Sequence, residues 1–330
     1  MKAVLVHTPG GVDALNYIDV PEPKPGPDEV LIRAEAFGVG MPDTLIRSGK
    51  YKWMPPLPAN PGNDAAGRIA AVGANVKDVK VGQKVLLSAR DLAQRGGCYA
   101  EMIAAPADAI HLLPDNIDPH LAVCLANYQV AFALLHEARG KQDPKSVLVV
   151  GAAGGVGSAL VQLAKLAGMK VIGTVSTDEK AEFARAMGAD DIIFYRTEDV
   201  VARTRELTAG QGVDLILDHA TGKAFADLIG ALAKWGTLVS YNGFSALPDK
   251  DVIAEMRKHM AICPAVRSFS FHIYDHDRDA RRAIMRQVIA HLAGGEIKPA
   301  IAARLTLSEV RKAHTLLESG AALGKIVMTP

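Results

Sequence analysis

The stretch VLVVGAAGGVGSALVQLAKLAG, residues 147–168, decides the fold of this chain. Four apolar residues lead into a glycine-rich turn, and the apolar residues after the turn recur at the spacing of one helix face. This order predicts a buried strand, a tight turn and an amphipathic helix. Gly154 and Gly157 fit the second and third glycines of the dinucleotide-binding fingerprint, while Ala152 stands at the first position, directly after Gly151.

The glycine turn has the properties needed to hold a pyrophosphate. The second glycine lets the backbone approach the phosphates, and the third lets the helix pack closely on the strand. The start of the helix adds free N–H groups and the positive end of its dipole. A glycine pattern also occurs in ordinary tight turns, but here further strand and helix patterns follow it. We therefore predict that Ala153, Gly154, Gly155 and Val156 bind the phosphates of a dinucleotide.

The end of the next strand distinguishes NADP(H) from NAD(H). NAD sites place a carboxylate there for the ribose 2′-hydroxyl, but this chain has Val175 and Ser176, with Lys180 one turn into the next helix. A hydroxyl and an ammonium suit a 2′-phosphate. Asp178 and Glu179 are the competing candidates for the acid, although acids also stabilise the first turn of any helix. The sequence predicts NADP(H).

Composition narrows the possible partners. The 330 residues suffice for two domains, and Lys plus Arg (37) nearly equal Asp plus Glu (36), so charge gives no support for nucleic acid or an anionic membrane surface. No apolar run is long enough to span a bilayer, and the N-terminal one is too short for a signal peptide. The cysteines Cys98, Cys124 and Cys263 are widely spaced and odd in number, which argues against a disulfide framework. We expect a cytoplasmic protein without nucleic-acid or membrane partners.

The chain changes character twice along its length. Residues 1–115 are rich in Pro and Gly and contain short strand-like runs, which predicts a compact, largely antiparallel β domain. From about 119 to 267, helical patterns alternate with continuous apolar runs typical of a parallel sheet covered on both faces, and GTLVSYNG at 236–243 is predicted to close this series. A helix is predicted around 278–293, then a second helical pattern and a last strand. The fold class is α/β.

Motifs along nearly the whole chain resemble those of the medium-chain dehydrogenase/reductase superfamily, and within it the zinc-independent NADPH:quinone oxidoreductases related to zeta-crystallin. The resemblance implies a Rossmann domain, with a doubly wound parallel sheet, over 119–267. It also implies a GroES-like β-rich catalytic domain over 1–118, which residues 268–330 complete. The matching stretches include DTLIRSGKY (43–51), NPGNDAAGRIAAVG (60–73), GGCYAEMIAAP (96–106), GAAGGVGSALVQLAK (151–165) and GKIVM (324–328).

The same resemblance argues against zinc. Zinc-dependent relatives take a cysteine at the position of Gly40 and a histidine at the position of Asn63, and neither residue here is a competent zinc ligand. The four clustered cysteines of the structural zinc lobe are also missing from the sequence. Asp64 remains, but one carboxylate does not make a metal site. We therefore expect NADP(H) as the cofactor and no zinc. Because the chain has one dinucleotide fingerprint, we also expect no flavin.

The resemblance implies where an acceptor would bind. Tyr51 is similar to a tyrosine near the substrate, whose phenol can donate to a carbonyl oxygen or merely form part of the wall. Asn63 is expected to face the substrate, although its amide could instead tie down a loop. Gly40 and Val130 replace polar residues common in relatives, which predicts an apolar pocket. The predicted catalytic residues are Tyr51 and Asn63, and the predicted pocket residues are Gly40, Tyr51, Trp53 and Val130.

Further cofactor contacts follow from the resemblance. Tyr195 is expected to cover the adenosine and meet the 2′-phosphate, or else to pack at a strand end. Tyr241 and Asn242 follow a strand, where ligands bind in doubly wound folds. Phe269 and Phe271 are expected near the nicotinamide. The predicted cofactor-binding set is Ala153, Gly154, Gly155, Val156, Ser176, Lys180, Tyr195, Tyr241, Asn242, Phe269, Phe271 and Lys325.

These features predict an NADPH-dependent oxidoreductase that transfers a hydride to a small quinone or a similar conjugated carbonyl acceptor. Two alternatives stay open: reduction of the C=C bond of an enone, alkenal or enoyl thioester, and NADPH binding with little turnover, as in crystallin-type members of the family. The resemblance also implies a homodimer formed through the nucleotide domain. We expect GTLVSYNG or a neighbouring segment to supply the sheet edge that pairs.

Overall fold

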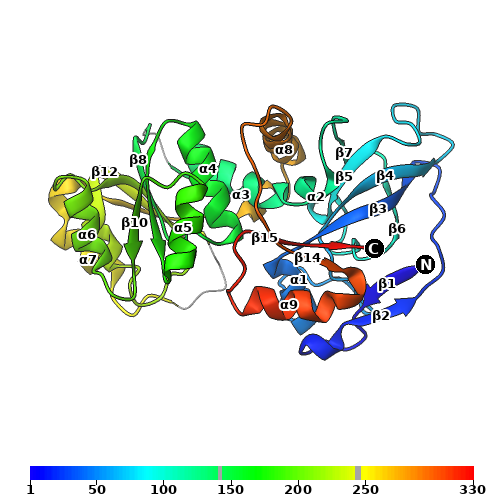
Figure 1. The fold of residues 1–330 in the computed structure, drawn as a ribbon, viewed down its shortest axis with the longest axis horizontal. Helices are drawn as coiled ribbons and strands as arrows, with labels where there is room; N and C mark the ends of the chain where they lie inside the picture. The colour runs from blue at the N-terminus through cyan, green and yellow to red at the C-terminus, as the bar shows by residue number, and fades with distance from the viewer. Residues whose placement is uncertain (140–142, 242–246) are drawn as a thin grey trace. The chain divides into compact units, whose positions relative to one another are not determined.

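The computed structural model describes residues 1–139, 143–241 and 247–330, which form two compact units. Unit 1 contains Met1–Ala126 and Met285–Pro330, so both ends of the chain contribute to it, whereas unit 2 contains Asn127–Ile284 (Figure 1). The domain boundaries implied by the family, at 118/119 and 267/268, stay a prediction.

A six-stranded parallel sheet forms the centre of unit 2. Counted along the chain from β8, its strands follow the 3-2-1-4-5-6 order of the dinucleotide-binding doubly wound fold, which confirms the predicted fold class. The order reverses between β8 and β11, and ligands bind beside such a reversal in open parallel sheets. In spatial order the strands are β10 (Asp191–Phe194), β9 (Lys170–Val175), β8 (Ser146–Val149), β11 (Val213–Asp218), β12 (Leu232–Ser240) and β13 (Ala265–Ser268).

Local sequence explains why these elements form. The central strands are apolar on both faces, and Leu148, Ile172 and Ile216 have no exposed surface. The helices of this part of the chain are α3 (Leu125–His136), α4 (Gly155–Leu166), α5 (Asp178–Ala186), α6 (Val200–Leu207) and α7 (Val252–Lys258). Of these, α5, α6 and α7 begin at a capping side chain: Asp199 Oδ1, for example, accepts from the backbone N–H groups of Val201 and Ala202.

One prediction about the sheet was wrong. GTLVSYNG does not close the series, because β13 pairs with β12 on its far side, with Leu238 opposite Val266. The predicted strand therefore has neighbours on both sides, and the edge belongs to β13. With four residues, most of them exposed, β13 lacks the apolar run by which its neighbours could be recognised.

Unit 1 is built on a seven-stranded sheet with a separate two-stranded hairpin, β1 (Lys2–Leu5) with β2 (Asn16–Asp19). Its pairs are antiparallel except for β14 with β15. Strand β3 pairs with β15, so residues near the two ends of the chain lie side by side. The strands in spatial order are β14 (Ile301–Thr306), β15 (Lys325–Thr329), β3 (Glu29–Val39), β4 (Asp64–Val72), β5 (Lys84–Ser88) and β7 (Ile110–Leu112), with β6 (Met102–Pro106) also on β3.

The helices of this region include α1, which directly follows β3 and lies between the predicted site residues Gly40 and Tyr51. Within the ranges described above, no helix is both long and apolar enough to cross a membrane. The helices are α1 (Met41–Ser48), α2 (Pro119–Ala122), α8 (Arg278–Ala293), which begins in unit 2, and α9 (Val310–Glu318).

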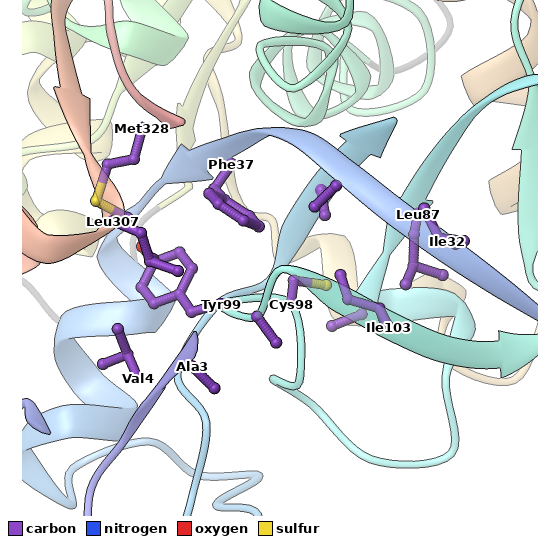
Figure 2. Packing of buried hydrophobic residues seen from close by; sticks show 14 of the residues in the cluster. Ala3, Val4, Ile32, Phe37, Leu87, Cys98, Tyr99, Ile103, Leu307 and Met328 are labelled. Carbon is purple, nitrogen blue, oxygen red and sulfur yellow. The ribbon is translucent and has the colours of Figure 1, made fainter. Parts of the chain in front are cut away.

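The core of unit 1 joins segments from the whole length of the chain. Tyr99 is completely buried, and its ring meets that of Phe37 edge-on with 6.2 Å between centroids. Val4 from the N-terminal strand and Leu307 and Met328 from the C-terminal segment belong to the same cluster (Figure 2). Burying side chains of this size stabilises each by roughly 1.5–3 kcal/mol, so the C-terminal segment is an integral part of this core.

Candidate functional site

The glycine turn connects β8 to α4 beside the reversal in strand order. A Cβ atom on Gly157 would lie 2.2 Å from the carbonyl oxygen of Gly151, so the close approach of helix and strand requires glycine there. Gly154 is the N-cap of α4 and has no side chain to occupy the first N–H groups. These N–H groups and the helix dipole fit the phosphates of a dinucleotide.

The structure gathers the predicted 2′-phosphate residues at the carboxyl ends of β9 and β10. The backbone N–H of Tyr195 donates to the carbonyl of Val175 across 3.2 Å, and Ser176 follows directly. Thr177 caps α5 by accepting from the backbone N–H of Lys180, which places Lys180 in the first turn at the same end of the sheet. The position where NAD sites carry a carboxylate is occupied by the apolar side chain of Val175, which is buried.

His219 lies at the glycine turn, although the sequence did not single it out. Its Nδ1–H donates to the carbonyl of Val150 across 3.0 Å, and a Cβ on Gly151 would lie 2.3 Å from its Cε1 atom. The centroid of its ring is 6.1 Å from that of Tyr241, the residue that directly follows β12. His219 could have been found from its place directly after β11, at the carboxyl end of a parallel strand. Asn242, predicted with Tyr241, lies outside the described residues.

The remaining predicted residues of unit 2 share one apolar cluster. Phe271 is buried against Ala133 and Ile284, and its ring lies 4.9 Å from that of Tyr274. Val130 and Phe269 are partly buried and pack against the same cluster. Packing on one another is thus the observed role of these side chains, and their contact with a nicotinamide or an acceptor stays a prediction.

In unit 1, the start of α1 is organised around the carboxylate of Asp43. Its Oδ2 accepts from the backbone N–H of Gly40 across 2.7 Å and from the hydroxyl of Tyr99 across 3.0 Å. Its Oδ1 accepts from the amide of Asn63 across 2.6 Å. Burial raises the pKa of Asp43 to about 7, against the hydrogen bond from Asn63 and the nearby charge of Lys325, which lower it.

Asn63 has both amide hydrogens committed within unit 1. Its Nδ2 donates to Asp43 Oδ1 and, across 3.0 Å, to the carbonyl of Pro61. Since a carboxylate and a carbonyl both accept, these partners fix which end of the amide is nitrogen. The amide therefore ties its loop to α1, and Oδ1 is the atom that remains for a ligand.

The side chain of Lys325 on β15 reaches over Gly38 on β3 toward Asp64 on β4. The register sets Val327 opposite Gly38 and Gly38 opposite Asp64, and extending it one pair places Lys325 beside Gly40. Because Gly38 lacks a side chain, the lysine stem crosses the middle strand and its Nζ comes within 3.8 Å of Asp64 Oδ2. Burial raises the pKa of Asp64, while Lys325 and Arg90 oppose the rise.

Tyr51 and Trp53 are neighbours, with ring centroids 5.7 Å apart. Tyr51 is only 6% exposed and packs with Ile46 and Ala59. Gly40, Tyr51 and Trp53 thus belong to unit 1, whereas Val130 of the predicted pocket belongs to unit 2. The role of the Tyr51 hydroxyl toward an acceptor stays a prediction.

The residues of unit 1 do not fit a zinc ion. Gly40 has no side chain, the Asn63 nitrogen is a donor already bonded to Asp43, and the ammonium of Lys325 lies beside Asp64. A second cation there would be repelled by this ammonium. Within residues 1–139, 143–241 and 247–330, no group of three or more His, Cys, Asp or Glu side chains is arranged to hold a metal ion.

Two family models match the chain. Residues 26–115 match the model described as alcohol dehydrogenase GroES-like domain, and residues 155–283 match the one described as zinc-binding dehydrogenase. The second model begins at Gly155, so it covers α4 and the strands β9 to β13 of unit 2, and it does not include Gly40 or Asn63.

Full-length relatives cover nearly the whole chain. Quinone oxidoreductase of Salmonella typhimurium is 31% identical over 98% of both chains, and 2-haloacrylate reductase of a Burkholderia species is 30% identical over 100% of this chain and 99% of its own. Among solved structures, quinone oxidoreductase of Escherichia coli complexed with NADPH matches with a TM-score of 0.86 and 29% identity over the full length of both chains.

Proposed function

Because this chain belongs to the quinone oxidoreductase family of the medium-chain dehydrogenase/reductases, we propose that it is an NADPH-dependent oxidoreductase whose acceptor is a small quinone or a similar conjugated carbonyl compound. The observation that carries the proposal is the glycine turn at the reversal of the parallel sheet, with Ser176, Lys180 and Tyr195 at the ends of the neighbouring strands.

The chain's own residues bind and orient the cofactor in this proposal. NADPH, when bound, supplies the hydride. The backbone of Ala153, Gly154, Gly155 and Val156 holds the pyrophosphate at the start of α4. Ser176, Lys180 and Tyr195 select the 2′-phosphate, Tyr241 lies near the glycine turn, and Phe269 borders the nicotinamide.

An apolar acceptor suits the residues expected around it. Gly40, Tyr51, Trp53 and Val130 offer little that could pair with a charged or heavily hydroxylated substrate, whose unpaired polar groups would cost several kcal/mol on burial. Aromatic rings stack well on a flat conjugated molecule. A small quinone meets both conditions.

Reduction of an activated C=C bond is the second candidate function. Its support is the relative named 2-haloacrylate reductase, which is about as similar to this chain as the quinone oxidoreductases are. Both reactions use the same hydride donor and differ in the atom that receives the hydride.

Steady-state oxidation of NADPH tests the proposal. The purified protein is assayed with p-benzoquinone, phenanthrenequinone, cyclohexenone and a haloacrylate, with NADH as the comparison cofactor. Turnover of the quinones supports the proposal. Turnover of the C=C compounds alone would establish the second function, and NADPH binding without turnover of any acceptor would make the chain a binding protein.

Tyr51→Phe tests the proposed donor to the acceptor oxygen. If the phenol stabilises charge that develops during hydride transfer, kcat falls more than KM rises. Unchanged kinetics would leave Tyr51 as a wall residue of the cluster with Ile46 and Ala59.

Three further properties belong to the proposal. We expect a homodimer that pairs the β13 edges of two copies, because β13 is the outer strand of its sheet.

We expect activity without zinc or flavin, since Gly40 and Asn63 replace zinc ligands and the chain has one dinucleotide fingerprint. The three free cysteines fit a reducing cytoplasm. A monomeric mass at micromolar concentration, or stoichiometric zinc or flavin in the purified protein, would contradict these expectations.

A further inference from the structure

The side chain of Lys325 is largely buried, but its Nζ is not one of the completely enclosed polar atoms that lack a partner. The residue is 5% exposed, and its one ion pair, with Asp64 Oδ2 at 3.8 Å, is too long for a hydrogen bond. Across the described parts of the chain, no acceptor lies within hydrogen-bonding distance of Nζ. An ammonium has three N–H donors, which a ligand that reaches Nζ could accept from.

Two glycines lie next to this ammonium. Nζ lies 3.6 Å from the place where a Cβ on Gly40 would be, and Gly40 is partly exposed. A Cβ on Gly38 would lie 2.9 Å from Lys325 Cε, so two glycines create the space that the lysine and its neighbourhood use. The charged groups that act here are Asp43, Asp64 and Arg90, and none of them bonds to Nζ.

Other donors in this part of unit 1 are already engaged. The amide hydrogens of Asn63 go to Asp43 and Pro61, and the Tyr99 hydroxyl goes to Asp43. Of Asn63, Tyr99 and Lys325, Lys325 is therefore the one whose N–H groups make no hydrogen bond within the described residues, and Asn63 Oδ1 is an acceptor that makes none there.

We propose that Lys325 is a catalytic residue whose Nζ–H binds the acceptor oxygen and donates its proton to it. The inference rests on the proposed reduction of a conjugated carbonyl acceptor. The hydride from NADPH brings two electrons to the acceptor, and the carbonyl oxygen becomes an oxyanion. The N–H bond of Nζ then breaks as the O–H bond forms, and the neutral amine regains a proton from water.

Asp64 is the positioning residue in this arrangement. Its carboxylate faces the ammonium at 3.8 Å, and because it lies beyond hydrogen-bonding distance it leaves the N–H groups for the ligand. Ser88 bonds to Asp64 and holds that carboxylate on the next strand. This differs from a role of Lys325 in binding the cofactor, which the family resemblance implies.

Ionisation of p-nitrophenol, bound to the protein loaded with NADP⁺, tests the inference without turnover. The phenolate oxygen imitates the oxyanion, and its absorbance reports the ratio of phenolate to phenol. We expect the wild type to raise this ratio at least about tenfold at a fixed pH, because a charged donor within about 4 Å stabilises the anion. Lys325→Met should abolish the increase. Lys312→Met, an exposed lysine on α9, should retain it.

Asp64→Asn keeps the test decisive if Lys325→Met does not fold. Removing the competing carboxylate leaves the ammonium to the probe alone, so the phenolate fraction should rise above that of the wild type. No increase in the wild type, an equal increase in Lys325→Met, or no change in Asp64→Asn would overturn the inference.

Kinetics separate this inference from the proposed function. In Lys325→Met, kcat for a quinone should fall about 10²–10³-fold while the Kd for NADPH stays unchanged. A weaker NADPH complex with an unchanged effect on the probe would instead assign Lys325 to the cofactor. If the wild type reduces no quinone yet ionises p-nitrophenol through Lys325, the proposed function fails and the donor site stands.

Discussion

The hydroxyl of Tyr99 donates to Oδ2 of Asp43 across 3.0 Å, which connects a completely buried ring of the unit 1 core to the first turn of α1. The same ring meets the imidazole of His314 edge-on, with 6.2 Å between centroids. Two buried titratable groups, Asp43 and His314, thus flank one phenol. Their pKa values are displaced in opposite directions, so they affect stability over pH with opposite signs.

Asp43→Asn should change how stability depends on pH. The native pKa of Asp43 is about 7, above its ordinary value of 3.8, so the native state holds more protons than the unfolded state between these values. Stability from this group is therefore lost as pH rises, by about 2–3 kcal/mol between about pH 5 and about pH 8. Urea unfolding should show that the free energy of unfolding of the wild type, relative to that of the variant, falls as the pH rises. The same change in exposed Asp13→Asn would refute the assignment.

His314→Gln should remove a slope of the opposite sign. Burial lowers the pKa of His314 to about 4 from 6.5, helped by the adjacent charge of Arg47, so the unfolded state holds more protons in this interval. Stability is present above about pH 6.5 and falls by about 3 kcal/mol as the pH drops to about 4. In the variant, the free energy of unfolding should depend less on pH between about 4 and 6.5. His7→Gln, which replaces an exposed histidine, should behave as the wild type.

Lys180→Ala should weaken NADPH binding and leave NADH binding nearly unchanged. One charge-assisted partner of a phosphate contributes about 1–3 kcal/mol, which corresponds to a rise in Kd of roughly 5-fold to 150-fold. Titration calorimetry with both cofactors measures it. Lys170→Ala is the matched control, because Lys170 begins β9 at the opposite end of the strand and bonds to the Leu207 carbonyl. Equal losses for the two cofactors would contradict the preference for NADPH.

Gly154→Ala and Gly157→Ala should separate two roles of the glycine turn. A Cβ on Gly157 meets the Gly151 carbonyl at 2.2 Å, so this variant should lose about 1–3 kcal/mol of unfolding free energy as well as NADPH affinity. A Cβ on Gly154 lies at an ordinary 3.5 Å from the same oxygen, so the variant should remain as stable as the wild type. Its NADPH affinity should still fall, because the methyl group stands where the phosphates approach. Thermal unfolding and cofactor titration of both variants check this pair, and an unaltered affinity in both would remove the turn from the cofactor site.

Much of the architecture followed from local sequence. Continuous apolar runs predicted the central parallel strands, and the amphipathic helix predicted after the glycine turn is α4, Gly155–Leu166. Glycines at 154 and 157 predicted the turn, because a close backbone approach excludes a side chain whatever the rest of the chain does. Such features depend on neighbours in sequence, so periodicity and glycine spacing record them.

Register between distant segments was decided by the tertiary structure alone. The short edge strand β13 has no periodic signal of its own and exists because β12 offers it a partner. The approach of Lys325 over Gly38 to Asp64 depends on the pairing of three strands, and Gly38 and Lys325 are 287 residues apart in the sequence (325 − 38). A shift of one residue in either pairing would turn the lysine to the other face of the sheet. The sequence could indicate which residues have donors or acceptors, but the tertiary structure decides which of these groups are already hydrogen-bonded. Asn63 was predicted from its place in a motif, and only the positions of Asp43 and Pro61 show that its amide hydrogens are already taken.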